Sequence, residues 1–297
     1  MPDPAFFAFL VVDGALAGAI YALVALAFVV VYKASRMINF AVGEWTMVGS
    51  RTAAAVGQVL GIGLAGALGA ACVAMIGLAL LFNRVVLRPL LQRSLLSLIM
   101  VTIGVGIFMR GAATVVFAGR PVRIVSPFSA DPLVLGGLPV AVDKIAAAAI
   151  AAAAIAALSW FFHGSRTGLA LRAVASDQQV AMAVGIDLHR HFALTWGLVG
   201  VLSVLAGTLW SVASGGGFGI ELLGLKVFPI VILGGLDSLP GTIIAAFVVG
   251  ILESLVTGYL DPFVGGGFSH VASYVVLIGT LLVRPYGFLG RPDVERV

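Results

Sequence analysis

The chain has 297 residues, of which 61% are hydrophobic and only 10% are charged, and its mean hydropathy is +1.15. So few polar side chains cannot cover the surface of a soluble globule, so the composition excludes that class and predicts one transmembrane domain, residues 1–297. The net charge of +4 does not indicate nucleic-acid binding, because the basic residues interrupt apolar runs instead of clustering on one solvated face.

The apolar runs predict an all-α polytopic membrane protein with about eight to nine transmembrane helices. In the first run, near residues 10–32, the basic residues follow the apolar stretch. This order is wrong for a cleaved signal peptide and predicts a retained span whose N-terminus lies outside. The other candidate spans lie near residues 38–57, 59–82, 95–118, 141–162, 192–214, 222–236, 240–260 and 268–283.

Two of these candidates are interrupted by glycine and polar residues, at 37–44 and at 233–241. Broken backbone at membrane depth is tolerated only where protein or a water-filled cavity satisfies its amide groups. We therefore expect discontinuous or re-entrant helices that line a path, and the two similar breaks are compatible with two halves built alike. The expected path or break residues are Asn39, Gly43, Glu44, Gly234, Gly235 and Asp237.

Ionisable side chains within apolar runs are costly and are functional candidates by default. Glu44 either holds the broken backbone at 37–44 or faces a solute path. Arg110 and Glu253 are expected to pair with each other across the bundle as a static ion pair.

Basic residues gather in three segments that the positive-inside bias assigns to the cytoplasm. Nine crossings from an outside N-terminus place residues 83–94, 163–191 and the C-terminus inside. The residues concerned are Arg84, Arg88 and Arg93, then Arg166, Arg172 and Arg190, then Arg284, Arg291 and Arg296. The connector near 119–140, predicted outside, runs against the bias with Arg120 and Arg123.

The second of these segments has the pattern of a short helix but is too polar to span. Ser176 and Gln179 match a capping box, Asp177 favours a helix N-terminus, and Gly185 suits the position just past a helix end. The pattern predicts a helix over about residues 177–184. Such a helix suits docking into a groove of a soluble partner or resting on lipid headgroups, and the residues leave both open.

Two pairs of glycines, Gly14 with Gly18 and Gly57 with Gly61, have the GxxxG spacing that predicts close helix packing. Motifs for chemistry are missing from the sequence: it has no GxxxxGK(S/T) loop, no GxSxG and no HExxH. The single cysteine, Cys72, and the four histidines lack companions at ligand spacing. We expect no catalytic residue and no metal site.

Four segments, spread over nearly the whole chain, resemble motifs of one transporter family. In chain order they are residues 37–41 with 43–44, residues 172–177 with Ala181 and Gly185, residues 233–235 with Ser238 and 240–241, and residues 284–290. The second resembles the family's cytoplasmic coupling segment. The chain thus resembles the permease family of branched-chain amino acid ABC transporters, the LivH/LivM type.

The resemblance implies a permease subunit of an ATP-binding-cassette importer in the bacterial inner membrane, carrying branched-chain or related amino acids by alternating access. It implies a second permease subunit, two cytoplasmic ATP-binding subunits and a periplasmic solute-binding protein. ATP and Mg²⁺ would bind to the ATPase subunits, with no cofactor on this chain, which is not itself an enzyme. The implied coupling residues, within segment 163–191, are Arg172, Ala173, Asp177, Ala181 and Gly185.

Val42 and Asp237 depart from the family pattern, and both lie in the expected path. The cargo therefore stays open among branched-chain amino acids, other amino acids, urea and short amides. The alternative function is a secondary transporter or facilitator of a small polar solute that works alone. It would need a relay of buried carboxylates, for which Glu253 and Asp237 are the available residues.

Overall fold

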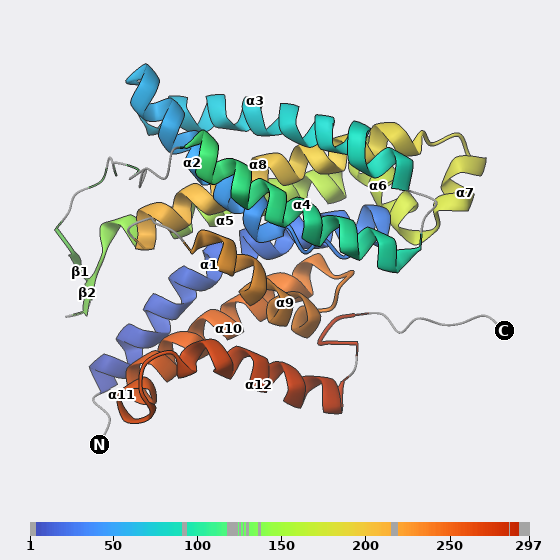
Figure 1. The fold of residues 1–297 in the computed structure, drawn as a ribbon. Helices are drawn as coiled ribbons and strands as arrows, with labels where there is room; N and C mark the ends of the chain where they lie inside the picture. The colour runs from blue at the N-terminus through green and yellow to red at the C-terminus, as the bar shows by residue number, and fades with distance from the viewer. Residues whose placement is uncertain are drawn as a thin grey trace.

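The computed structural model describes residues 4–90, 94–117, 124, 126, 128, 131–135, 138–214, 219–284 and 286–290. Nearly all of this chain is helical, and the helices lie side by side (Figure 1). The α-helices are α1 Pro4–Ser35, α2 Val42–Leu60, α3 Leu64–Phe82, α4 Leu95–Val116, α5 Val142–Gly164, α6 Arg166–Ser176, α7 Gln178–Ala183, α8 Leu188–Ser214, α9 Leu223–Gly234, α10 Leu239–Tyr259, α11 Asp261–Val264 and α12 Phe268–Val283. The short helical turns are η1 Asn83–Leu87, η2 Arg88–Leu90 and η3 Ile220–Leu222.

The predicted all-α polytopic architecture is confirmed. In the described part of the chain, six helices are long and apolar enough to cross a membrane: α1, α3 with its extension to Leu90, α4, α5, α8 and α10. Three predicted spans form shorter or more polar helices, namely α2, α9 and α12. At about 1.5 Å per residue, α9 is about 18 Å long, which is too short to cross a hydrocarbon core of about 30 Å alone. This agrees with the predicted discontinuity.

One element departs from the helical pattern. In the connector predicted outside, β1 Leu133–Leu135 and β2 Leu138–Val140 form an antiparallel hairpin. Two basic residues that run against the positive-inside bias, Arg120 and Arg123, lie outside the described residues.

Helix α1 forms the centre of the bundle, and its residues 19–31 are almost completely buried. Its first GxxxG pair packs against α10: a Cβ added at Gly14 would come 2.6 Å from the carbonyl oxygen of Gly250, and one at Gly18 would come 2.9 Å from that of Ala246. The prediction of close packing is confirmed there. The same prediction is wrong for Gly61 of the second GxxxG pair. Gly61 ends α2 with a φ of 62°, and a Cβ added there would meet no atom within 4 Å.

The longer helices run between two opposite ends of the molecule (Figure 1). The start of α1, α11 and the hairpin lie at one end, and α6 and α7 lie at the other. The second end carries the predicted cytoplasmic segments. There, η1, α7 and the end of α1 meet around a small pocket lined by Ser35, Asn83 and Gln178. Arg93, Pro285, Arg291 and Arg296 lie outside the described residues.

Candidate functional site

The connector 163–191 folds into two short helices whose starts are capped by side chains. Ser165 Oγ accepts a hydrogen bond from the Gly168 amide at 2.9 Å at the start of α6. Asp177 Oδ1 accepts from the amides of Gln179 at 2.8 Å and Val180 at 3.0 Å at the start of α7. The predicted cap at Ser176 is therefore wrong, because α6 runs through Ser176 and the extended backbone of Asp177 brings its carboxylate to the free amides.

Helix α7 ends as the sequence predicts. Gly185 has a φ of 85°, its amide donates to the Met182 carbonyl, and the Ile186 amide donates to the Ala181 carbonyl, both at 3.0 Å. This pair of bonds is the Schellman arrangement that favours glycine at its turning point. The predicted position of Gly185 is confirmed.

The coupling residues inferred from the resemblance occupy different positions around α6 and α7. Ala181 is buried, Arg172 and Ala173 are half-buried, and Asp177 and Gly185 are exposed where they begin and end α7. The exposed apolar side chains of α7 and its C-cap were not predicted from the sequence: Val180, Met182 and the C-cap Val184 are 59%, 52% and 71% exposed. The spacing of four between Val180 and Val184, which puts both on one helix face, was the available signal.

The connector 163–191 is attached to the end of α1, where the first break begins. Gln178 Nε2 donates to the Ala34 carbonyl at 3.1 Å, and Arg36 Nη2 donates to the Ala175 carbonyl at 3.4 Å. Among the described non-glycine residues, Arg36 alone has a positive φ, at 54°. These bonds give α6 and α7 a direct connection to the non-helical residues 36–41.

The first break lies between α1 and α2, and protein groups satisfy its backbone as expected. Asn39 Oδ1 accepts from the Ala41 amide at 3.0 Å, and Thr102 Oγ1 of α4 accepts from the Phe40 amide at 3.3 Å. Gly43 packs tightly on the start of α9, since an added Cβ would come 2.9 Å from the Gly224 amide nitrogen. Three of the predicted residues, Asn39, Gly43 and Glu44, thus lie at one crossing of chain segments.

Glu44 forms an ion pair with Arg110, with 2.6 Å between Oε1 and Nη2. The predicted pair of Arg110 with Glu253 is therefore wrong. Helix α4 packs on α2, whereas α10 packs on α1, α9 and α12. Gly106, one turn before Arg110, leaves room for the Glu44 carboxylate, which would lie 3.2 Å from a Cβ there.

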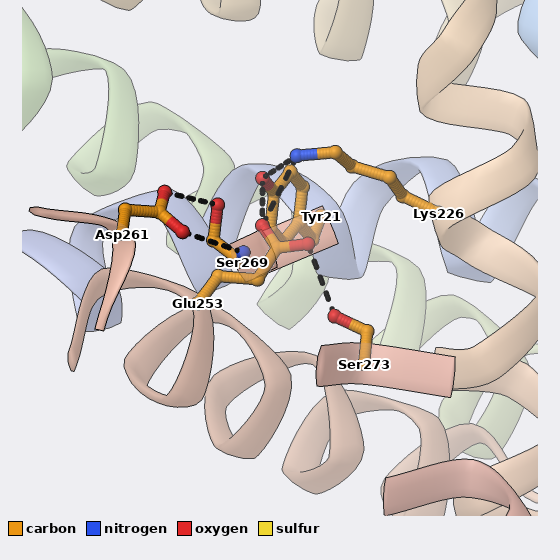
Figure 2. Close-up of polar contacts among 6 residues, drawn as sticks. All are labelled: Tyr21, Lys226, Glu253, Asp261, Ser269 and Ser273. Carbon is orange, nitrogen blue, oxygen red and sulfur yellow. Dashed lines mark hydrogen bonds and ion pairs between the residues drawn. The ribbon is translucent and has the colours of Figure 1, made fainter. Parts of the chain in front are cut away.

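Glu253 instead belongs to a buried polar cluster that joins α1, α9, α10 and α12 (Figure 2). Its Oε2 accepts from Tyr21 Oη at 2.7 Å and from Lys226 Nζ at 3.1 Å, and its Oε1 accepts from Ser273 Oγ at 3.1 Å. Lys226 also donates to Tyr21 Oη at 3.2 Å. The sequence reasoning missed Lys226, although a lysine within a predicted span is a signal by itself.

Near this cluster, Asp261 ties the start of α12 to the end of α10 (Figure 2). It accepts from the Ser269 amide and hydroxyl, both at 3.0 Å, and from the Gly267 amide at 3.4 Å. Desolvation raises the pKa of Asp261, but the hydrogen bonds from Ser269 and Gly267 outweigh it, so the pKa lies below its ordinary value.

The second break lies between α9 and α10 and contains Gly235 and the half-buried Asp237. Gly235 has a φ of 100°, and Ser238 Oγ caps α10 by accepting from the Gly241 amide at 3.1 Å.

The chain near the C-terminus returns to this break. Phe288 and Leu289 donate their amides to the carbonyls of Leu233 at 2.7 Å and Gly234 at 3.3 Å. An added Cβ on Gly235 would come 2.5 Å from the Gly290 amide nitrogen. The glycine-rich motif and the terminal motif of the sequence are therefore one structural unit.

The breaks, the charged pairs and the connector all lie within a region that one family model covers. Residues 10–283 match the family described as the permease component of branched-chain amino acid transport systems. The chain belongs to this permease family. It is a multi-pass membrane protein of a transport system, as the sequence predicts.

Curated relatives of this permease match over nearly their whole length. The LivH permease protein of the high-affinity branched-chain amino acid transport system is 32% identical in both Salmonella typhimurium and Escherichia coli, over 96% of each chain. The BraD permease protein of Pseudomonas aeruginosa is 31% identical over the full length of both chains. No solved structure matches the permease.

The family is a transport component and not a family of enzymes. Within the described part of the permease, no three His, Cys, Asp or Glu side chains group in a way that could hold a metal ion. Four charged residues of the bundle form ion pairs, Glu44 with Arg110 and Lys226 with Glu253.

Proposed function

We propose that this permease is the membrane subunit of an ATP-driven importer for branched-chain or related amino acids. It would assemble with a second permease subunit, two cytoplasmic ATP-binding subunits and a periplasmic solute-binding protein. ATP and Mg²⁺ would be bound by the ATPase subunits, and this chain would bind no cofactor. The names of the LivH and BraD relatives, which are permease proteins of branched-chain amino acid systems, support the cargo class.

The observation that carries this proposal is the apolar face that α7 exposes at the predicted cytoplasmic end. Both ends of α7 are capped by hydrogen bonds. Val180 and Val184 are nevertheless 59% and 71% exposed. A short, rigid helix with an apolar face is suited to a groove on a soluble protein. The ATPase subunits are the partners that such a groove would belong to.

Movement would pass from this docking helix into the membrane through α1. The bonds from Gln178 to Ala34 and from Arg36 to Ala175 connect α6 and α7 to the first break. ATP can drive alternating access only if its binding favours one position of the connector over the other. Arg172, Ala173, Asp177, Ala181 and Gly185 would then act by keeping α6 and α7 folded and seated.

The two breaks are the proposed places where the helices bend as the path opens and closes. Gly43 and Glu44 lie where α2 begins, and Gly234, Gly235 and Asp237 lie between the short helix α9 and the start of α10. Discontinuous helices commonly line solute paths in transporters, because only there can irregular backbone be satisfied at membrane depth.

A pull-down of the tagged chain from its native membrane in mild detergent tests the docking helix. We expect the wild-type chain to retain ATP-binding subunits, and Val180→Asp with Val184→Asp to lose them. Val59→Asp is the control. Val59 is also an exposed valine, at 81%, but it lies near the C-terminal end of α2, far from α7 (Figure 1). Asp177→Ala should weaken retention more than Asp177→Asn, which can still cap the helix.

Two results would contradict the proposal. If the wild-type chain retains no ATP-binding subunit, the importer function is wrong. If the valine variants retain the subunits as well as the Val59 control does, α7 is not the docking helix.

A further inference from the structure

The Arg110 side chain combines a charge with exposure within the apolar helix α4. At about 1.5 Å per residue, Arg110 lies about 22 Å from Leu95 at the start of α4 and about 9 Å from Val116 at its end. The side chain is 52% exposed, whereas that of its partner Glu44 is only 11% exposed. Charged side chains within membrane-spanning helices are rare and almost always face a water-filled cavity or a protein contact.

Three other ionisable side chains of the bundle are enclosed by protein. Lys226 and Glu253 are 19% and 9% exposed and face each other within the cluster of Figure 2, and Arg51 is a buried residue. The Arg110 pair differs from them because half of its cationic member faces outward.

The outward side of Arg110 has both free hydrogen-bonding capacity and space. A guanidinium has five N–H donors, and the bond to Glu44 engages Nη2. On the adjoining face of α4, a Cβ added at Gly104 or Gly111 would meet no atom within 4 Å. Ile107, three residues before Arg110 and on the same side of the helix, is 69% exposed.

We propose that Arg110 and Glu44 form a binding site for the zwitterionic head group of an α-amino acid on the translocation path. The planar guanidinium of Arg110 takes the carboxylate, the Glu44 carboxylate takes the ammonium group, and Ile107 contacts an apolar side chain. This inference rests on the proposed importer function and narrows its cargo. Urea and short amides lack the two opposite charges that the pair would complement.

The pair also gives a physical reason for weak binding, which an importer needs in order to release its cargo. The cargo carboxylate competes with Glu44 for the same guanidinium, and the cargo ammonium competes with Arg110 for Glu44. Binding of the cargo therefore weakens the Arg110–Glu44 pair, and departure of the cargo restores it. The site recognises charge without holding the solute tightly.

The test uses the assembled importer in liposomes with internal ATP and leucine as the probe. Glu44→Gln with Arg110→Gln removes both charges and leaves neither unpaired, so a structural role predicts uptake within twofold of wild type. A zwitterion site predicts at least a tenfold loss. Asp13→Asn with Lys144→Gln is the matched control, because that ion pair has the same 2.6 Å separation and lies between α1 and α5.

A charge exchange separates the two roles further. Glu44→Arg with Arg110→Glu restores an ion pair, so restored uptake would overturn the proposal, whereas continued loss supports it. If these double variants fail to assemble, Arg110→Lys decides, since it keeps the charge and loses the planar fork. A raised KM for leucine supports the site, and an unchanged KM overturns it. Absence of leucine uptake by the wild-type complex would instead refute the importer function.

Discussion

Replacing Glu253 with alanine tests the buried cluster that holds α9 against its neighbours. The change removes the acceptor of three hydrogen bonds, from Tyr21, Lys226 and Ser273. It leaves the Lys226 ammonium enclosed without its counter-charge. Removing one partner of a buried ion pair costs about 3–5 kcal/mol. We expect about 3 kcal/mol, the lower end, because Lys226 keeps Tyr21 Oη as an acceptor at 3.2 Å.

The assay is reversible unfolding of the purified chain in mixed micelles with increasing SDS. Lys226→Met with Glu253→Leu is the decisive companion, because replacing both charges with apolar side chains of similar size is often neutral or stabilising. Ser273→Ala, which removes one hydroxyl donor, should cost only about 1 kcal/mol. A loss below 1 kcal/mol for Glu253→Ala, or a double variant as unstable as the single one, would refute this reasoning.

Two further predictions concern stability. Gly250→Ala should destabilise the chain by about 1–3 kcal/mol, because its Cβ would come 2.5 Å from the Gly14 carbonyl oxygen. Gly279→Ala on α12 is the control and should show no loss of stability, because its Cβ would meet open space. Equal effects of the two substitutions in SDS unfolding would contradict this prediction. The pKa of Asp261 is depressed in the folded chain, so its stabilisation is present above the ordinary value of 3.8 and is lost as the pH falls through the folded value. The difference in unfolding midpoint between wild type and Asp261→Asn should therefore shrink on acidification, and a difference that does not depend on pH would contradict the assigned role.

The spans and breaks were predictable because they depend on local sequence. Apolar runs of helical length placed the ends of every long helix to within six residues, and Gly185 marked the end of α7 because that turn requires a positive φ. The cap of α7 was missed by one residue. Ser176 and Asp177 can both cap, and the choice depends on how far α6 continues.

The charge pairs could not be predicted from local sequence. Which helices are neighbours decides that Arg110 meets Glu44 and that Glu253 meets Lys226, and a chain of similar apolar runs contains little information about neighbours. The docking of residues 286–290 on the second break likewise depends on the return of the chain after α12.

The central claim is that this permease moves amino acids only when ATP-binding subunits drive it. The most direct test measures leucine uptake into liposomes that contain the chain alone or the complex assembled with its co-purified subunits and its solute-binding protein. The account predicts uptake by the complex that requires ATP, and none by the chain alone. Uptake by the chain alone without ATP would contradict the account and favour a secondary transporter or facilitator.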